Sequence, residues 1–388
     1  MKVLHVTPWY EPAWSSGGTA VSASNMCRAL VRLEAEVCVL TTTDMGAGQV
    51  LSKQSYVDEL GGVEVHYAAC GLAGTSFRQG AFSFTLCKNI VSKVAAFDIV
   101  HIHSTRHVYG AVTALACRRA NIPYIVTAHG SLMPWWIEGI GRPFIKKLYI
   151  NMIDRYVLAG AKSLHFLSDF ERESSTQWSF NKVSFVLPNG IKKQKSAFVN
   201  KSNEQRIKLL HVGRIHPQKN TLELIKAACQ FSSESIILDI IGAVDDEPFY
   251  TACRDYIANN NIRHVRLLGA KSFEEVQKAY TNYDLFCMPS VVEGVSMALI
   301  EAASFGLPAL VSEFVGNYRE ILADGSGVLV GVDAESISLG IASLVKDKEK
   351  LDALKLNALN SVNKRYDIDR VAALLMQKYN SLEESIQF

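Results

Sequence analysis

Short apolar runs alternate with longer segments of helical periodicity along most of the chain. The apolar runs predict strands, which in the first half are Lys2–Val6, Glu36–Thr41, Asp98–His103, Tyr124–Ala128, Lys162–Leu167 and Val183–Leu187. Segments with helical spacing lie between them, at Ala20–Leu33, Phe84–Phe97 and Val108–Arg119. Strands and helices that alternate in this way predict a doubly wound parallel sheet of the α/β class.

The second half of the chain repeats the alternation. Strands are predicted at Ile207–Val212, Leu285–Met288 and Ala309–Val311, and two further strands end at Gly242 and Gly269. Helical spacing is strong over Glu335–Leu359 and Asp369–Glu384. The segment Ser52–Gly62 has neither pattern and predicts a loop.

The length of 388 residues is sufficient for two domains, each with its own core. Residues 191–205, IKKQKSAFVNKSNEQ, are rich in Lys, Ser and Asn and follow the turn Pro188-Asn189-Gly190, so this segment is predicted to link the domains. The predicted domains are residues 1–192 and 205–368.

Composition narrows the class of protein. A hydrophobic content of 48% and a net charge of +2 are typical of a globular protein and give no basis for a nucleic-acid partner. The eight cysteines are scattered without a Cys-x-x-Cys pair, which indicates free thiols in a reducing, cytoplasmic compartment. Pro8 and Glu11 interrupt the first apolar run too early for a signal peptide, and no apolar stretch approaches the ~20 residues that span a bilayer.

The stretch Asp284–Ser312 contains the largest number of candidate functional residues. Its pattern predicts a strand, a loop, a helix and a second strand. Glu293 lies in the loop at the carboxyl end of the first strand, where open parallel sheets bind ligands, and Glu301 lies on the helix. Gly294 permits close approach of the backbone, and N–H groups at the helix N-terminus suit a phosphate. The residues that carry these groups are Val295, Ser296 and Met297. An isolated pair of glutamates would more simply be two surface charges.

Two cations lie at another strand end. Arg214 follows Ile207–Val212, and Lys219 stands five residues further on, before a helix that starts at Thr221. An arginine binds a phosphate bidentately and a lysine acts as a point charge, so the pair suits a diphosphate. The alternative is two surface charges.

The loop after the first strand lacks Gly-x-Gly-x-x-Gly, which argues against a dinucleotide dehydrogenase. Its Gly17 and Gly18 open a helix and suit close approach to a phosphate or sugar, although an ordinary turn would also use them. His129, followed by Gly130, ends a strand at the ligand-binding edge and is interpreted as functional. His103 also ends a strand, and a structural role and a role in lining the site remain equally open.

Residues 132–161 combine aromatic and basic side chains. Trp135, Trp136, Phe144 and Tyr149 are interleaved with Arg142, Lys146, Lys147 and Arg155. Such a helix could lie on an anionic membrane surface, or it could pack within the domain with a solvated basic face.

Two of these patterns together resemble glycosyltransferase family 4. They are Glu293-x7-Glu301, closed by Gly306-x-Pro308, and Gly213-Arg214-x4-Lys219. The pattern His129-Gly-x3-Pro-Trp135 resembles family members that build bacterial exopolysaccharide or O-antigen, whose acceptor is often lipid-linked. Family 4 enzymes are retaining glycosyltransferases.

The resemblance implies a GT-B fold, in which two Rossmann-like doubly wound domains face a central cleft and the last helix, 369–388, packs on the N-terminal domain. It implies that Glu301 accepts hydrogen bonds from the ribose and that Glu293 and His129 hold the transferred sugar. The glycines Gly17 and Gly18 would face the diphosphate. The nucleotide base would meet Gly269, Ala270 and Lys271.

The expected activity is transfer of a hexose from a nucleotide diphosphate sugar, such as UDP-glucose, to a glycan or lipid-linked acceptor in polysaccharide biosynthesis. Negative charge develops on the leaving diphosphate, where Arg214, Lys219 and backbone N–H groups would stabilise it, so no metal or other cofactor is expected. The expected location is the cytoplasm, with peripheral contact at the inner face of the plasma membrane. A GDP-mannose-dependent mannosyltransferase and a catalytically silent nucleotide-sugar-binding subunit are the alternatives.

Overall fold

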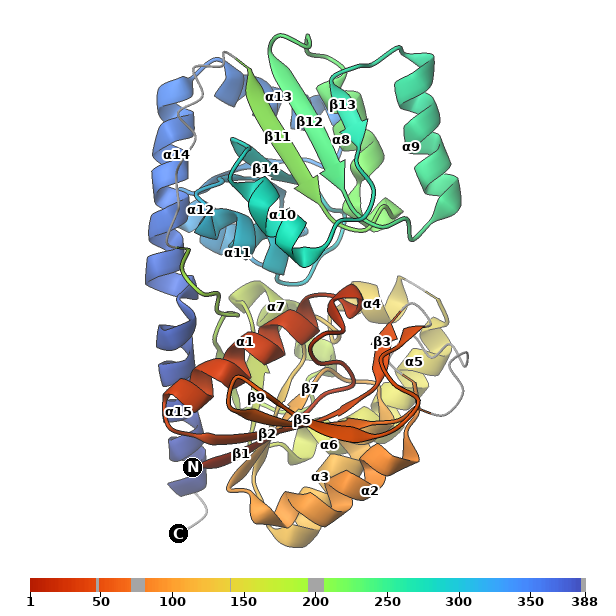
Figure 1. Ribbon diagram of the computed structural model, residues 1–388, viewed down its shortest axis with the longest axis vertical. Coiled ribbons are helices and arrows are strands. Elements are labelled where there is room, and N and C mark those ends of the chain that lie inside the picture. Colours follow the sequence, from red (N-terminus) through yellow and green to blue (C-terminus); the bar gives the residue numbers. More distant parts are fainter. Residues whose placement is uncertain (47–48, 71–80, 140, 195–205, 385–388) are drawn as a thin grey trace. The chain divides into compact units, whose positions relative to one another are not determined.

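The computed structural model describes all residues except 47–48, 71–80, 140, 195–205 and 385–388. Most of the predicted linker therefore lies outside the described residues. The chain divides into two compact units (Figure 1). Unit 1 comprises Met1–Gly190 and Ile368–Phe388, and unit 2 comprises Ile191–Asp367.

Unit 1 is built on an eight-stranded sheet with the order β10-β9-β8-β7-β1-β2-β6-β5. Its strands are β1 (Lys2–Val6), β2 (Glu36–Thr42), β5 (Tyr56–Leu60), β6 (Val63–Ala68), β7 (Ile99–His103), β8 (Tyr124–Thr127), β9 (Ser163–Phe166) and β10 (Ser184–Val186). Neighbouring strands are parallel except for β5, which is antiparallel to β6. A small separate sheet pairs β3 (Asp44–Gly46) with β4 (Gln49–Val50).

Helices cover both faces of this sheet. Successive strand residues point to opposite faces, and the residues on each face are largely apolar, so both faces are buried. One core contains Leu4, Val100 and Val126 with residues of α2 (Phe84–Lys93), α3 (Val108–Ala120), α4 (Pro134–Glu138) and α6 (Arg155–Gly160). The other contains Val3, Ile99 and Ile125 with residues of α1 (Gly18–Arg32) and α15 (Ile368–Glu384). The remaining helical segments are α5 (Pro143–Tyr149), α7 (Asp169–Ser174) and the short turns η1 (Trp14–Ser16), η2 (Val94–Ala96), η3 (Ile150–Asp154) and η4 (Thr176–Trp178).

A directional hydrogen-bond chain fixes the last helix to the sheet. His165 Nε2 lies 2.7 Å from the Leu187 carbonyl, so this nitrogen must donate and Nδ1 must accept from Thr127 Oγ1 (2.7 Å). Thr127 then accepts from His101 Nε2, which leaves His101 Nδ1 to accept from the Tyr379 hydroxyl of α15 (2.6 Å). Every member of this chain is paired, and α15 is thereby tied to the middle of the unit 1 sheet.

Unit 2 contains a six-stranded parallel sheet with the order β13-β12-β11-β14-β15-β16. Its strands are β11 (Ile207–Val212), β12 (Ile236–Ile241), β13 (Val265–Leu267), β14 (Leu285–Met288), β15 (Ala309–Ser312) and β16 (Gly327–Val330). The chain runs outward from β11 to one edge and then returns to β14 on the other side of β11. The strand order therefore reverses between β11 and β14, which makes this pair the switch point of a Rossmann-like sheet.

The helices of unit 2 lie on both sides of its sheet, with a separate apolar core on each side. They are α8 (Thr221–Ala228), α9 (Glu247–Asn259), α10 (Phe273–Tyr280), α11 (Met297–Ser304), α12 (Tyr318–Ala323), α13 (Ala334–Val345) and α14 (Lys348–Ser361), with the short turns η5 (Pro217–Lys219) and η6 (Val362–Tyr366).

Two sequence predictions were wrong in detail. The segment predicted as a loop, Ser52–Gly62, contains β5, an exposed edge strand whose polar side chains conceal the strand pattern. The predicted helix Glu335–Leu359 is two helices, α13 and α14, because Asp347 ends one run and caps the next by accepting from the Lys350 N–H (2.9 Å).

Candidate active site

The switch point of unit 2 brings together the loops that follow β11 and β14. Two hydrogen bonds join these loops: the Val291 N–H donates to the Gln218 carbonyl (2.9 Å), and the Asn220 amide donates to the Pro289 carbonyl (3.0 Å). The groups on both loops are therefore held in one place. An open α/β sheet binds its ligand at this position.

Lys219 and Glu293 form an ion pair across the switch point. Lys219 is carried by η5 after β11, and Glu293 lies in the loop after β14. Their side chains are only 14% and 22% exposed, so water screens the pair less than it would a surface salt bridge. The structure thus joins two residues that the sequence predicted to be functional and that are 74 positions apart.

The loop between Glu293 and α11 is held against the segment after β15. The Glu293 N–H donates to the Phe314 carbonyl (3.0 Å), and the Gly316 N–H donates to the Gly294 carbonyl (3.0 Å). A Cβ on Gly316 would lie 2.8 Å from the Gly294 carbonyl carbon, so only glycine permits this approach. Within the described part of the chain, the N–H groups of residues 295–297 at the start of α11 have no acceptor, and they can donate to an anion.

Glu301 is buried on α11 and faces α10. Its Oε2 accepts from the Tyr280 hydroxyl (3.2 Å) and the Gln277 amide (3.4 Å). Burial raises the pKa of Glu301 to about 7, and the hydrogen bond from Tyr280 opposes this rise. The second oxygen, Oε1, has no partner among the described side chains and can accept from a ligand hydroxyl.

Arg214 stands at the same edge but is more exposed than Lys219. Its guanidinium forms an ion pair with Asp245, and the two side chains are 50% and 41% exposed. The backbone below it is closely packed, because a Cβ on Gly242 would lie 1.8 Å from the Gly213 carbonyl oxygen. The backbone at Arg214 is therefore fixed in position, while its guanidinium faces solvent, where an anionic ligand can approach it.

The segment Gly269–Lys271, predicted to meet the base, follows β13 at the edge of the sheet. The Gly269 carbonyl accepts from the Gly242 N–H (3.0 Å), and Lys271 forms a long ion pair with Glu275 (3.6 Å). Gly269 and Gly242 therefore connect this segment to the loop that carries Arg214. Ala270 is exposed, and contact of this segment with a base stays a prediction.

In unit 1, Gly17 and Gly18 begin α1. Gly17 is the N-cap residue, has a φ of 108° and is exposed, and α1 starts at Gly18. The prediction that these glycines approach a phosphate stays a prediction.

His129 lies two residues after the end of β8 in a left-handed backbone conformation, with a φ of 51°. The buried carboxylate of Glu171 fixes this turn by accepting from the Gly130 N–H and, through Oε2, from the Leu167 N–H (2.7 Å). Burial raises the pKa of Glu171 to about 7, while both N–H groups favour its charged form. Glu171 was not predicted as a site residue, although Ser168-x-x-Glu171 is the pattern of a helix start and Ser168 does cap α7.

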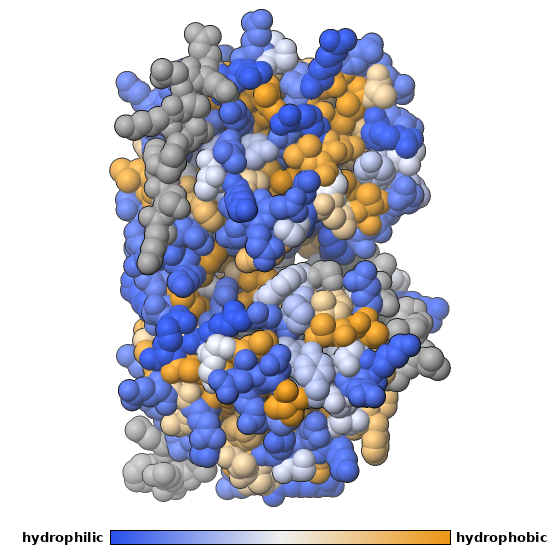
Figure 2. All heavy atoms as spheres, viewed as in Figure 1, coloured by the Kyte–Doolittle hydropathy of each residue, from blue (hydrophilic) through white to orange (hydrophobic). Residues whose placement is uncertain are grey.

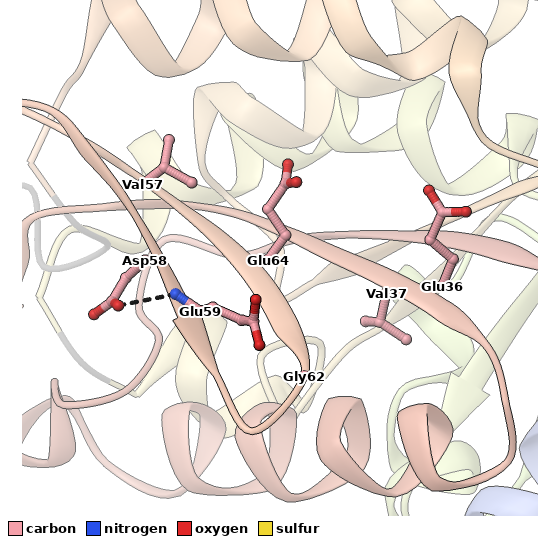
Figure 3. Close-up of a pocket in the computed structure, with 7 residues that line it drawn as sticks. All are labelled: Glu36, Val37, Val57, Asp58, Glu59, Gly62 and Glu64. Atoms are coloured by element: carbon pink, nitrogen blue, oxygen red, sulfur yellow. Dashed lines mark hydrogen bonds between the residues drawn. The ribbon is translucent and has the colours of Figure 1, made fainter.

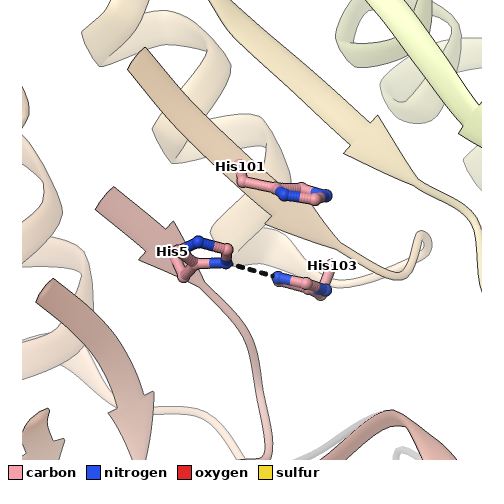
Figure 4. A group of neighbouring side chains, drawn as sticks. All are labelled: His5, His101 and His103. Carbon is pink, nitrogen blue, oxygen red and sulfur yellow. Dashed lines mark hydrogen bonds between the residues drawn. The ribbon is translucent and has the colours of Figure 1, made fainter. Parts of the chain in front are cut away.

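His129 also belongs to a group of neighbouring histidines, whose other members lie on β1 and β7. His5, His101 and His103 lie close enough together to offer ligand atoms to one metal ion (Figure 4). However, both nitrogens of His101 are occupied by Tyr379 and Thr127, and its ring stacks on that of His103 at 4.3 Å and 16°. Stacked rings direct their lone pairs in parallel, whereas a zinc ion needs them to converge. The group is better described as hydrogen-bonded histidines.

The potential ligands of two other groups are paired with other side chains or protonated. Glu64 bonds His66 (2.5 Å), and burial raises the pKa of the neighbouring Cys38 thiol to about 12, which keeps it protonated. In the sequence Asp367-Ile368-Asp369, the first carboxylate pairs with Lys193 (2.6 Å) and the second with Arg32 (2.5 Å).

A shallow hollow of about 430 Å³ lies on unit 1, over β2, β5 and β6 (Figure 3). Its lining includes the carboxylates of Glu36, Asp58, Glu59 and Glu64. These negative charges would repel a diphosphate, so this hollow is unsuited to a nucleotide sugar. The switch point of unit 2, with Lys219 and Arg214, has the appropriate charge.

Comparison with known proteins agrees with this geometry. The family model "Glycosyl transferases group 1" matches residues 192–361, and the model "Glycosyl transferase 4-like domain" matches residues 17–190. Among solved structures, sucrose-phosphate synthase from Thermosynechococcus elongatus superposes with a TM-score of 0.76 at 15% identity, over 99% of this chain and all of that one. The Anabaena protein HepE, crystallised with UDP and glucose, gives 0.76 at 16% identity, over 98% and 100%.

Two relatives with similar sequences are named as glycosyltransferases. An Escherichia coli enzyme, UDP-Gal:alpha-D-GlcNAc-diphosphoundecaprenol alpha-1,3-galactosyltransferase, is 26% identical over 73% of this chain and 79% of its own length. The GDP-mannose:cellobiosyl-diphosphopolyprenol alpha-mannosyltransferase of Xanthomonas oryzae is 22% identical over 98% and 97%.

The two Rossmann-like units define the GT-B fold, and the matching family models define the class of protein as a glycosyltransferase. Because the two family models match one after the other along the chain, the protein belongs to glycosyltransferase family 4, as its motifs predicted.

Proposed function

We propose that the protein transfers a hexose, with retention of configuration, from a UDP-sugar such as UDP-glucose to a glycan or lipid-linked saccharide in polysaccharide biosynthesis. The observation that carries the proposal is the Lys219–Glu293 ion pair beside the free N–H groups of residues 295–297. A cation, a carboxylate and an anion-binding helix start thus meet at the switch point of unit 2.

In the proposed reaction, the ion pair opens when the donor binds. The diphosphate takes the place of Glu293 on Lys219, and the released carboxylate becomes free to accept from hydroxyls of the transferred sugar. Glu301 Oε1 accepts from the ribose. Arg214 exchanges its exposed partner Asp245 for the diphosphate, which costs little because surface ion pairs are weak.

The proposed reaction needs no metal ion. Cleavage of the sugar–phosphate bond leaves negative charge on the diphosphate, and Lys219, Arg214 and the N–H groups at α11 would stabilise it.

The choice of a UDP-sugar is supported by the relatives. The Escherichia coli relative is named for UDP-galactose, and the Anabaena structures contain UDP and UDP-glucose. A GDP-mannose donor is the second candidate, because the Xanthomonas oryzae relative that is named for it matches almost the whole chain.

The deciding experiment is nucleotide release from a panel of UDP-, GDP- and ADP-sugars, with and without EDTA. We expect slow release of UDP from one UDP-sugar at a rate that EDTA does not change. Release of GDP from GDP-mannose would instead support the mannosyltransferase. Loss of activity in EDTA, restored by Mg²⁺ or Mn²⁺, would contradict the metal-free reaction. Silence with every donor, even with a lipid-linked acceptor present, would indicate a nucleotide-sugar-binding subunit.

A lipid-linked acceptor would require the protein to approach a membrane, and α5, η3 and α6 offer a surface for this. Phe144, Leu148, Met152 and Tyr156 recur every fourth residue and are all exposed, Phe144 by 78% and Met152 by 71%. Arg142 and Arg155 are exposed on the same segment. Elsewhere, in the view of Figure 2, hydrophobic side chains form separate patches on a mainly hydrophilic surface.

We therefore propose peripheral contact of this stripe with an anionic membrane. The aromatic residues that suggested such contact contribute unequally, since Trp135 and Trp136 pack edge to face (5.5 Å) and are only partly exposed. No helix in the described part of the chain is long and apolar enough to cross a bilayer.

Replacing Phe144, Leu148 and Met152 together with serine is expected to reduce binding to phosphatidylglycerol vesicles at low salt by at least about tenfold, because fully burying each such side chain contributes roughly 1.5–3 kcal/mol. Co-sedimentation measures this. The matched control replaces Phe84 and Val91 of α2, which are 75% and 60% exposed, with serine. Equal loss in both variants, or no vesicle binding by the natural chain, would refute the contact.

A further inference from the structure

Three histidines of unit 1 form a hydrogen-bonded chain that ends at the predicted site residue His129. His5 Nδ1 lies 2.9 Å from His103 Nε2, and His103 Nδ1 lies 3.0 Å from His129 Nε2. The planes of the bonded rings are inclined by only 22° and 25°, with ring centroids 5.2 Å and 5.3 Å apart. Figure 4 shows the inner link, between His5 on β1 and His103 on β7. We call these three residues the histidine relay.

Each ring of the histidine relay carries a single proton. Burial lowers the pKa of His5 and of His129 to about 3, and it lowers the pKa of His103 well below its ordinary value. A neutral imidazole has one N–H donor and one acceptor nitrogen. The two hydrogen bonds can therefore form in only two ways, with all protons directed outward to His129 or all directed inward to His5.

The inner end of the histidine relay favours the outward arrangement. His5 Nε2 is buried and has no hydrogen-bond partner among the residues that the structure describes. The inward arrangement would leave an unpaired N–H there, whereas the outward one leaves an unpaired acceptor. Buried N–H groups without an acceptor are the rarer of the two in proteins. His5 Nδ1 therefore donates to His103, and His103 Nδ1 donates to His129.

The neighbouring series of hydrogen bonds from Tyr379 to Leu187 has an acceptor at one end that fixes its direction, which the histidine relay lacks. There a backbone carbonyl, which can only accept, fixes the direction of every hydrogen bond. No carbonyl is bonded to the ring nitrogens of the histidine relay in the described structure, so the unpaired nitrogen of His5 is what distinguishes its two directions.

From this geometry we infer that His5 and His103 are positioning residues, which hold His129 in the tautomer with its proton on Nδ1. His129 is partly exposed, and its Nδ1 has no partner within the described ranges. The side chain therefore presents a hydrogen-bond donor to a ligand oxygen, such as a sugar hydroxyl or a phosphate oxygen. That ligand rests on the proposed function, whereas the tautomer itself does not.

Histidine tautomers can be measured in the full chain labelled with ¹⁵N-histidine, from two-bond ¹H–¹⁵N correlations at pH 7.5 without donor. We expect His129 to be protonated at Nδ1, with its signals assigned from the His129→Gln variant. A proton on Nε2 of His129 would overturn the inference. A protein that turns over no donor but shows the Nδ1 proton would refute only the proposed function.

Two variants of the middle residue test the relay itself. His103→Asn retains an N–H donor near the position of Nδ1, and His103→Leu has none. We expect His129 to keep its Nδ1 proton in the first and to lose this preference in the second. We also expect kcat/KM for the donor to fall roughly tenfold in His103→Leu and to recover in His103→Asn, as for one lost hydrogen bond. An unchanged His129 tautomer in a folded His103→Leu would overturn the role of His103.

Discussion

Replacing Lys219 with alanine is expected to lower kcat/KM for the donor by roughly 10²–10³-fold, the usual cost of removing one preorganised group that stabilises the leaving charge. Lys219 is the more buried of the two cations, so its charge acts on the diphosphate with less screening than that of Arg214. We expect Arg214→Ala to cost at least about 10²-fold, at the lower end of this range. Steady-state nucleotide release with the preferred donor measures both.

A loss in Lys219→Ala alone could also arise because Glu293 remains as an unpaired, partly buried carboxylate. The double variant Lys219→Met/Glu293→Gln removes both charges and separates the two explanations. If the pair only maintains the loop, the double variant regains activity, and the assignment fails. If the pair acts on the donor, the double variant stays as impaired as the single one. Arg254→Ala, which removes an exposed ion pair with Asp255 on α9, is the matched control and should be neutral.

The sequence allowed the location of this site to be predicted, because parallel strands share one carboxyl edge. Apolar runs and the turn residues that end them were sufficient to predict which groups lie at strand ends. These groups are Arg214, Lys219, Glu293 and the start of α11. Their contact could not be predicted from local pattern. It depends on β11 and β14 being neighbours, which is a property of strand order and is decided by packing over the whole unit.

The contacts that support the candidate residues could not be predicted for the same reason. His5 and His103 are 98 positions apart, and His101 and Tyr379 are 278 positions apart. Apart from His103, which ends a strand, each of these residues looks like an ordinary member of a buried strand or helix. Only alternation along β1 and β7, which places His5, His101 and His103 on the face covered by α1 and α15, gives an indirect signal. Whether His103 lines the site or has a structural role stays open, and we propose that it positions His129.

The buried histidines also make unit 1 sensitive to acid, and we expect it to lose most of its stability between pH 7.5 and 5. Burial lowers the pKa of His5, His101, His103, His107, His129 and His165, so the unfolded chain takes up protons first as the pH falls through 6.5. The four histidines whose pKa is lowered to about 3 or 4, His5, His107, His129 and His165, would each cost roughly 2 kcal/mol at pH 5, and His101 and His103 act in the same direction.

Two buried carboxyls of unit 1 oppose this loss. The pKa of Asp154 and of Glu171 is raised to about 7, so the folded state holds their protons more tightly and gains stability as the pH falls from 7 towards 4.5. Six histidines outweigh two carboxyls, and the net loss is several kcal/mol, comparable with the roughly 5–15 kcal/mol that stabilises a typical domain. In unit 2 the lowered pKa of His211 and the raised pKa of Glu301 nearly cancel.

The chain carries its own probe for this difference between the units. All five tryptophans lie in unit 1, at positions 9, 14, 135, 136 and 178, so tryptophan fluorescence reports on that unit alone. In urea titrations we expect the fluorescence midpoint to fall steeply from pH 7.5 to pH 5. Far-UV circular dichroism, which reports on both units, should show a second transition whose midpoint changes little. A fluorescence midpoint that is unchanged at pH 5 would mean that the histidines of the folded unit 1 accept protons at their ordinary pKa, and the neutral histidine relay would fail with it.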